Sequence, residues 1–251
     1  DDRLATVLFG LPPGDVSALA PSQLAAVHEM IWRWQHTPAA AGLPTAQLLG
    51  ADPASKLLAA QALAALLNRD LYRLGVDGVA AQVGDLETLV RLWQRESRLL
   101  PLLLYIDAHA ADAASPDAYT ALDRFLMRAA DGGSAILLGV RDAAPRLNCA
   151  TFSVDVAKPT PAEQRSAWID ALHQLGQASD AAWADAEAEA AAGRLAAQFS
   201  LNIPEIYGLA GSVSALGNAP AARNGRTADH ALDDRLWELC RATTRPQLDT
   251  L

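Results

Sequence analysis

The sequence predicts an α/β fold in which a five-stranded parallel sheet with flanking helices is followed by a small all-α subdomain. Between residues 44 and 158, short apolar runs alternate with stretches of helical periodicity, which is typical of a parallel sheet covered by helices. After residue 158 only helical patterns follow. The chain has 251 residues, of which 51% are hydrophobic and 20% charged, as expected of a globular protein.

Residues 1–43 are expected to form an N-terminal helical segment. Pro21 and Ser22 supply a helix start. Apolar side chains then recur at helical spacing at Leu24, Val27, Ile31 and Trp34. This pattern predicts a helix that packs against the rest of the domain.

The core is expected to span residues 44–158. Apolar runs of strand length lie at residues 46–49, 71–74, 102–107, 135–140 and 152–156. Helical patterns separate the first four runs, at residues 54–67, 86–98 and 116–130. Strands joined by crossover helices form a doubly wound parallel sheet.

An all-α subdomain is expected at residues 159–217. Thr160 and Glu163 have the spacing of a capping box, and Pro161 stands at the first helical position. Two more helices are expected, up to about residue 199 and over about 203–216. Residues 218–251 are interpreted as a linker and a connecting helix that leads toward a missing downstream module.

Charge and cysteine content limit the function. The sequence has 20 Lys and Arg against 29 Asp and Glu, a net charge of −9, which disfavours direct binding to nucleic acid or to an anionic membrane. The apolar runs are much shorter than the roughly 20 residues that cross a bilayer. Cys149 and Cys240 lack the spacing of a zinc site or a disulfide framework, which favours free, buried thiols. We therefore expect a cytoplasmic protein without a metal site.

The loop after the first core strand resembles a phosphate-binding loop. Residues 50–57 read GADPASKL, and a P-loop reads G-x-x-x-x-G-K-[ST] at this position. Gly50 and Lys56 are in register with that pattern. The alternative for Lys56 is a solvated lysine in the first turn of a helix.

Three residues of this loop depart from the pattern. Ser55 replaces the second glycine and places a Cβ where the backbone approaches phosphate. Leu57 replaces the hydroxyl residue and offers no oxygen to Mg²⁺. Asp52 adds a negative charge to a loop that binds anions in other proteins.

The strand at residues 102–107 ends in Asp107, which is where a Walker B strand delivers a carboxylate to the metal site. In hydrolysing proteins a glutamate follows and orients the attacking water, whereas this chain has Ala108. His109 is a candidate for a substitute base. A solvated loop histidine is the simpler interpretation of His109.

With this element order and these motifs, the chain resembles the AAA+ ATPases over residues 44–216. The resemblance implies a P-loop core at 44–158 and a helical lid at 159–217. Two further family features are altered. Residues 138–141 offer no small polar sensor residue, and the third lid helix at 203–210 carries no sensor arginine.

The chain is most similar to the degenerate N-terminal AAA+ module of bacterial two-module AAA+ proteins, including those associated with contractile injection systems. Residues 236–241 and 245–251 are similar to the segment that joins the two modules. The resemblance implies protein partners and other AAA+ modules, and it allows a ring oligomer formed through the parent protein. It implies that the parent protein is an AAA+ ATPase.

The first functional interpretation is a catalytically degenerate module with an assembly, regulatory or partner-binding role and no expected cofactor. The remnant nucleotide site would consist of Gly50, Ser55, Lys56 and Asp107. The second is weak binding of ATP or ADP with Mg²⁺ and slow hydrolysis, in which Arg141 or Arg146 acts on a neighbouring subunit. The third is a scaffold that binds no nucleotide.

Overall fold

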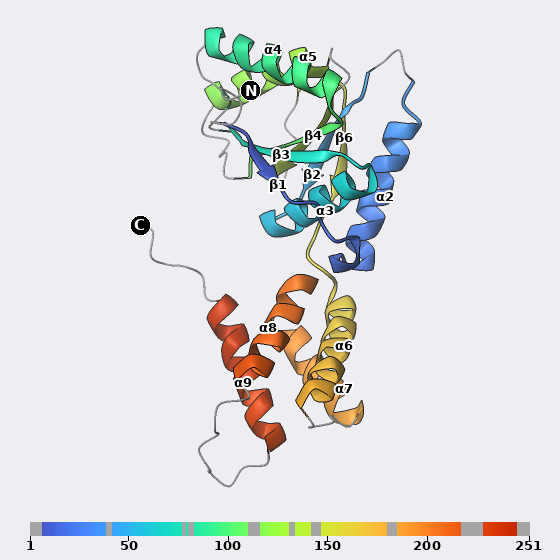
Figure 1. Ribbon diagram of the computed structural model, residues 1–251, viewed down its shortest axis with the longest axis vertical. Coiled ribbons are helices and arrows are strands. Elements are labelled where there is room, and N and C mark those ends of the chain that lie inside the picture. The colour runs from blue at the N-terminus through green and yellow to red at the C-terminus, as the bar shows by residue number, and fades with distance from the viewer. Residues whose placement is uncertain are drawn as a thin grey trace. The chain divides into compact units, whose positions relative to one another are not determined.

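The computed structural model describes residues 7–38, 42–76, 79, 83–109, 116–130, 134–141, 147–179, 185–216 and 228–244. The chain divides into two compact units, residues 1–157 and residues 158–251 (Figure 1). Each unit is described by itself. The finer division into four parts remains a prediction.

The first unit contains a six-stranded sheet. Its strands are β1 (Phe9–Leu11), β2 (Thr45–Leu49), β3 (Asp70–Gly75), β4 (Leu102–Asp107), β5 (Ala135–Val140) and β6 (Thr151–Asp155). Their order across the sheet is β1-β3-β4-β5-β2-β6. Strands β2 to β6 pair in parallel, which confirms the five predicted strands.

The strand β1 was not predicted, so the sheet has one strand more than expected. It is antiparallel to β3, with Phe9 opposite Arg73 and Leu11 opposite Leu71. Three residues are too few to show a period of two, and Pro12 and Pro13 follow directly. Only the pairing with β3 identifies this segment as a strand.

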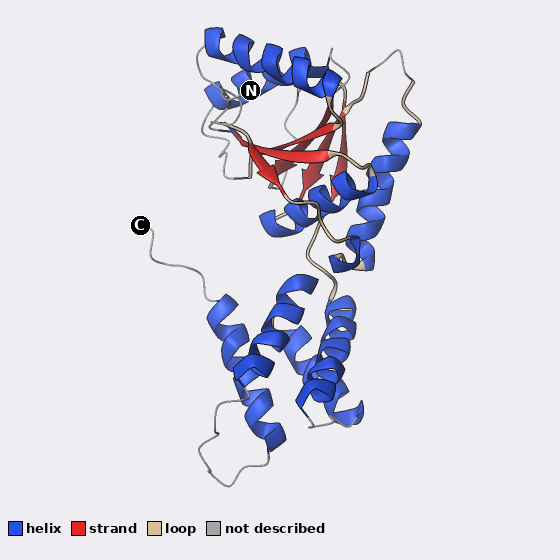
Figure 2. Ribbon diagram, in the orientation of Figure 1, coloured by secondary structure: helices blue, strands red, loops and turns tan. Residues whose placement is uncertain are grey.

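Helices cover both faces of the sheet (Figure 2). Helices α2 (Pro21–Gln35) and α3 (Pro53–Leu66) pack on one face, together with the short 3₁₀ helix η1 (Val16–Ala18). Helices α4 (Val83–Leu99) and α5 (Pro116–Ala130) pack on the other. This layering is that of a doubly wound α/β sheet.

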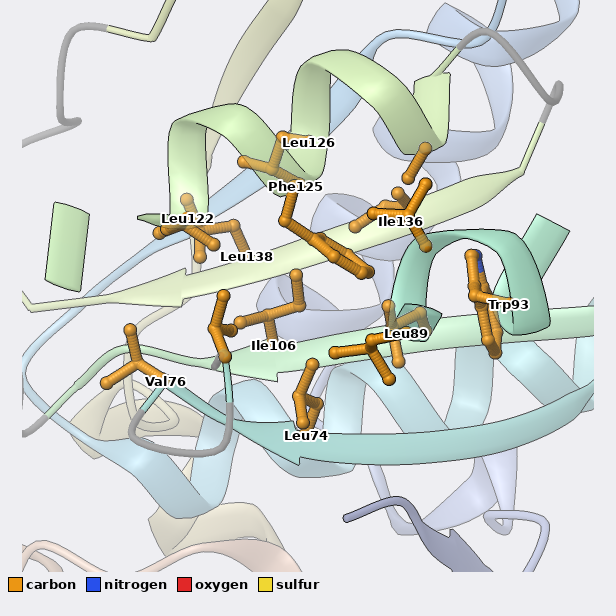
Figure 3. Close-up of a cluster of buried hydrophobic side chains, with 14 of the residues drawn as sticks. Leu74, Val76, Leu89, Trp93, Ile106, Leu122, Phe125, Leu126, Ile136 and Leu138 are labelled. Carbon is orange, nitrogen blue, oxygen red and sulfur yellow. The ribbon is translucent and has the colours of Figure 1, made fainter. Parts of the chain in front are cut away.

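The layer beneath α4 and α5 is a continuous hydrophobic core (Figure 3). Ile106 of β4 and Leu138 of β5 face this layer, and Trp93 of α4 and Phe125 of α5 close over it. Trp93 and Phe125 are almost fully buried. Because side chains alternate along a strand, Asp107 points to the opposite face, toward α3.

Tyr105 is buried on the α3 face, where its ring reaches Gly139 of the neighbouring strand. A Cβ atom at position 139 would clash with the phenol of Tyr105. Burial raises the pKa of Tyr105 well above its ordinary value, and the negative charge of Asp107 raises it further. The glycine in β5 therefore makes room for an aromatic ring beside the carboxyl ends of the strands.

The second unit consists of the helices α6 (Pro161–Ser179), α7 (Asp185–Gln198), α8 (Ile203–Leu216) and α9 (Ala228–Thr244). The predicted capping box is present. The backbone N–H of Thr160 donates to Glu163 at 2.7 Å, and the N–H of Glu163 donates to Oγ1 of Thr160 at 3.3 Å. Residues 217–227, which include the start of the predicted linker and connecting helix, lie outside the described residues.

A buried glutamine ties the start of α6 to the segment before α8. Gln164 donates to the carbonyl of Pro159 at 2.7 Å and accepts from the N–H of Leu201 at 3.0 Å. Farther along, the rings of Phe199 and Trp237 meet edge to face with centroids 5.0 Å apart. None of the described helices combines the length and the hydrophobicity that a membrane-spanning helix requires.

Candidate functional site

The residues singled out in the sequence meet at the carboxyl edge of the sheet, where β2, β4 and β5 end. Ligands of doubly wound proteins bind at this edge, because the loops that follow parallel strands converge there. The loop after β2 contributes Gly50 and leads into α3. The segment after β4 contributes Ala108 and His109.

Gly50 lets the loop after β2 pack closely against the segments that directly follow β5 and β6. Its φ of +153° is one that favours glycine, and a Cβ atom at this position would clash with the carbonyl oxygen of Val156. The Gly50 N–H donates to the carbonyl of Arg141 at 2.9 Å. The glycine is therefore required by packing between backbones, apart from any role toward phosphate.

Asp52 is the N-cap of α3. Its Oδ2 atom accepts from the backbone N–H of Ser55 at 2.8 Å and from the Ser55 hydroxyl at 2.6 Å. Ser55 is fully buried. Thus Ser55, a predicted site residue, is engaged with a carboxylate of its own helix turn.

Lys56 is 0% exposed, so the interpretation as a solvated lysine is wrong. Its Nζ atom donates to the carbonyl of Gly50 at 2.8 Å and to that of Val140 at 2.6 Å. It also lies 2.7 Å from Nδ1 of His109. An ammonium has three N–H donors, and these three acceptors match them in number.

Both oxygens of the Asp107 carboxylate contact other groups of the protein. It forms an ion pair with Arg73 of β3, with 2.5 Å between Oδ2 and Nη2. Its Oδ1 atom accepts from the backbone N–H of His109 at 3.1 Å. The side chain of Asp107 is 16% exposed and that of Arg73 is 45% exposed.

His109 follows β4 in a turn and is half-buried, and it contacts Lys56 through its ring and Asp107 through its backbone N–H. Burial, and then the charges of Lys56 and Arg141, lower the pKa of His109 below its ordinary value of 6.5. The neutral ring with its proton on Nε2 leaves Nδ1 free to accept from Lys56.

Leu57 and Ala108 stand where a hydrolysing protein has the metal-binding hydroxyl and the water-orienting glutamate, and both belong to the hydrophobic cores. Leu57 packs against the core beneath α2 and α3. Ala108 is almost fully buried in the core beneath α4 and α5. A glutamate at position 108 would have to place its charge in an apolar layer.

A nucleotide with Mg²⁺ does not fit the groups as they are arranged. The Lys56 ammonium is directed at backbone carbonyls, the first turn of α3 donates to the Asp52 carboxylate, and Asp107 is paired with Arg73. No cluster of three metal-binding side chains occurs among the described residues. A pocket of about 380 Å³ lies at the other edge of the sheet, near Asp70 and Pro101, where β3 and β4 begin.

The sequence analysis did not predict the ion pair of Arg73 with Asp107 or the contact of His109 with Lys56. The strand register pairs Gly75 with Asp107, which places Arg73 two residues earlier on the face that Asp107 occupies. An arginine in a strand of alternating polarity is the one signal that the sequence offered. Arg146, the second arginine considered above, lies outside the described residues.

Comparison with known proteins relates this chain to ATPases. Residues 160–246 match the family described as the contractile injection system ATPase helical domain. No curated protein was found to match the sequence.

The structure of C. elegans PCH-2, an AAA+ ATPase, is similar with a TM-score of 0.55 and 13% identity, covering 94% of this chain and 75% of that chain. At this identity the likeness shows the fold, which confirms the predicted fold class. The chain thus has the fold of an AAA+ ATPase, and its residues 160–246 are similar to the helical domain of contractile injection system ATPases.

Proposed function

We propose that this chain is a catalytically degenerate AAA+ module with an assembly, regulatory or partner-binding role within a larger contractile injection system ATPase. The match of residues 160–246 supports the assignment to that system. Within it, the module would act through protein partners and other AAA+ modules in the cytoplasm.

The environment of Lys56 is the observation that carries this proposal. A phosphate-binding lysine needs N–H groups that reach the ligand oxygens. Lys56 is fully buried, and its ammonium donates to Gly50 and Val140. Turning toward a ligand would take this donor away from the carbonyl oxygens of Gly50 and Val140, and leaving the buried Val140 oxygen unpaired costs about 1–3 kcal/mol.

The residues around Lys56 support a non-hydrolysing module over a slow ATPase. Leu57 and Ala108 lie in hydrophobic packing, so neither the metal-binding hydroxyl nor the water-orienting carboxylate has a substitute at its own position. Arg141 is exposed at the end of β5, and an arginine that acts on a neighbouring subunit needs such exposure. That arginine alone does not supply the two missing contributions.

An ATPase assay tests the proposal directly. Mg²⁺-dependent phosphate release would be measured for the wild type and for Lys56→Met, which replaces the ammonium by an apolar side chain of similar length. We expect equal rates at the level of the buffer. Wild-type turnover that exceeds the variant and disappears in Asp107→Asn would overturn the proposal in favour of a slow ATPase.

A further inference from the structure

The outer face of α4 and α5 is basic, although the chain as a whole has a net charge of −9. Both helices turn their apolar side chains toward the sheet, as Trp93 and Phe125 show (Figure 3). Among the described side chains of residues 86–130, every charged residue that is exposed is an arginine. We call this set the arginine face, and its members are Arg91, Arg95, Arg98, Arg124 and Arg128.

Helical spacing gathers these arginines on one surface. The three of α4 follow one another at intervals of four and three residues, and the two of α5 are four residues apart, so each row lies along one side of its helix. The two helices lie side by side (Figure 1). Glu87 joins the rows, because its carboxylate is 3.4 Å from Arg91 of α4 and 2.8 Å from Arg128 of α5.

Three carboxylates beside the arginine face already have partners within the protein. Glu87 is shared by two arginines, as described above. Glu96 pairs with Arg95 at 2.5 Å. Asp123 accepts from the backbone N–H and from the side-chain amide of Asn148, at 2.7 and 2.6 Å. The face therefore carries more positive charge than these carboxylates offset.

Arg98 and Arg124 account for this excess of positive charge. Within the part of the chain that the structure describes, neither of them forms an ion pair. Each has an exposed apolar residue nearby on its own helix, since Leu99 follows Arg98 and Met127 comes three residues after Arg124. Leu99 is 73% exposed and Met127 is 46% exposed. Arginine and methionine are both enriched where proteins bind one another.

We propose that the arginine face binds an acidic, amphipathic segment of a partner protein. Its carboxylates would pair with guanidinium groups, whose planar fork matches the geometry of a carboxylate. Its apolar side chains would pack on Leu99 and Met127. The inference rests on the partner-binding role in the proposed function and deepens it, because it names the chemistry of the partner.

Charge complementarity favours this occupant over a phosphate polymer or a membrane. A duplex nucleic acid or an anionic bilayer extends beyond a surface built from two helices, and there it would meet a chain whose net charge is negative. A short acidic segment is able to stay within the arginine face. Neither a nucleic acid backbone nor a lipid headgroup supplies apolar side chains for Leu99 and Met127.

A pair of charge reversals on the full chain tests this inference. Arg98→Glu and Arg124→Glu, made together, break no ion pair with a described residue. The matched control combines Arg235→Glu with Arg241→Glu, at exposed positions of α9, and changes the net charge by the same amount. Arg98 and Arg241 both lie in the last turn of their helices, so the two pairs also disturb the helix dipole alike. Circular dichroism would verify that each variant is folded.

The probe is a fluorescein-labelled synthetic helix of Glu, Leu and Ala, and the reference peptide has Gln in place of every Glu. Fluorescence anisotropy measures the affinity of each peptide. We expect the wild type to bind the acidic peptide, the arginine-face variant to bind it about tenfold more weakly, and the α9 control to stay within about twofold. Added salt should weaken binding of the acidic peptide. Arg98→Gln with Arg124→Gln, which removes the charges without reversing them, should show a smaller loss.

Equal affinity of the wild type and the folded arginine-face variants for the acidic peptide, or no wild-type binding, would overturn the inference. Tighter binding of duplex DNA or of phosphatidylserine vesicles than of the acidic peptide would overturn it in favour of a phosphate ligand. Sedimentation of the protein alone as a dimer that the variant lacks would assign the face to a second copy of the chain instead. Wild-type ATP hydrolysis would contradict the proposed function whatever the peptide binds, so the two failures are distinguishable.

Discussion

The Nζ atom of Lys56 lies 2.7 Å from Nδ1 of His109, and this contact joins the first turn of α3 to the segment after β4. The lysine stands where a P-loop lysine would bind phosphate, yet its ammonium contacts the chain at the ends of three strands. Its carbonyl partners, Gly50 and Val140, belong to the ends of β2 and β5. The ammonium is thus a structural centre of the carboxyl edge.

Replacing Lys56 should destabilise the first unit. In Lys56→Met two carbonyls and one ring nitrogen lose a buried donor, which we expect to cost about 3 kcal/mol. Hydrogen exchange of the α3 amides, followed by mass spectrometry, measures this loss of protection.

Lys158→Met is the matched control for this change. The Lys158 ammonium donates at 2.7 Å to the carbonyl of Ser200 in an exposed contact, so its loss should stay within about 0.5 kcal/mol. Equal losses of protection in the two variants would contradict the structural role of Lys56.

The titration of His109 should depend on Lys56. Burial and the nearby cations lower the pKa of His109 below 6.5, so the unfolded chain binds a proton at a higher pH than the folded chain does. His109 therefore contributes stability above pH 6.5 that is lost as the pH falls toward its folded pKa.

NMR titration of the imidazole C–H signals checks this coupling. Removing the ammonium in Lys56→Met should raise the pKa of His109 toward 6.5, because only burial and the charge of Arg141 then oppose the proton. Lys158→Met should leave the His109 titration where it is in the wild type. An unchanged pKa of His109 in Lys56→Met would show that the two groups are not coupled.

Gly50 should tolerate no side chain, whereas Gly75 should. A Cβ atom at position 50 would clash with the carbonyl oxygen of Val156. The backbone there also has a φ of +153°, which residues with a side chain disfavour. We expect Gly50→Ala to cost about 2 kcal/mol or more. Nothing lies within 4 Å of a Cβ atom at position 75, so Gly75→Ala should stay within about 0.5 kcal/mol. Urea denaturation that ranks these variants in the opposite order would refute the packing argument.

The buried amide of Gln164 should be important for the second unit. Gln164→Leu removes one donor and one acceptor, and it leaves the Pro159 carbonyl and the Leu201 N–H without their partner. We expect a loss of about 2 kcal/mol, read from the hydrogen exchange of α6 and of residues 199–203. Gln198→Leu, at an exposed position of α7, is the control and should change this protection by less than about 0.5 kcal/mol.

The fold could be predicted because its signals are local. Apolar runs of strand length located β2 to β6, and the Thr160–Glu163 pair located the start of α6. The strand β1 could not be predicted, because three residues beside two prolines acquire their structure only from pairing with β3. Asp107 and Lys56 were found as candidates because their positions relative to strand and helix are also local patterns.

The sequence by itself determined the order of strands and helices and the identity of the residues that end at the carboxyl edge. Only the tertiary structure decided what those residues contact. The partners of the Lys56 ammonium lie 6, 53 and 84 residues away along the chain, at Gly50, His109 and Val140. No periodicity or motif encodes the contacts with His109 and Val140, because they depend on how parallel strands bring their ends together. For this reason the same lysine that resembles a phosphate ligand in the sequence is a buried donor to the backbone in the fold.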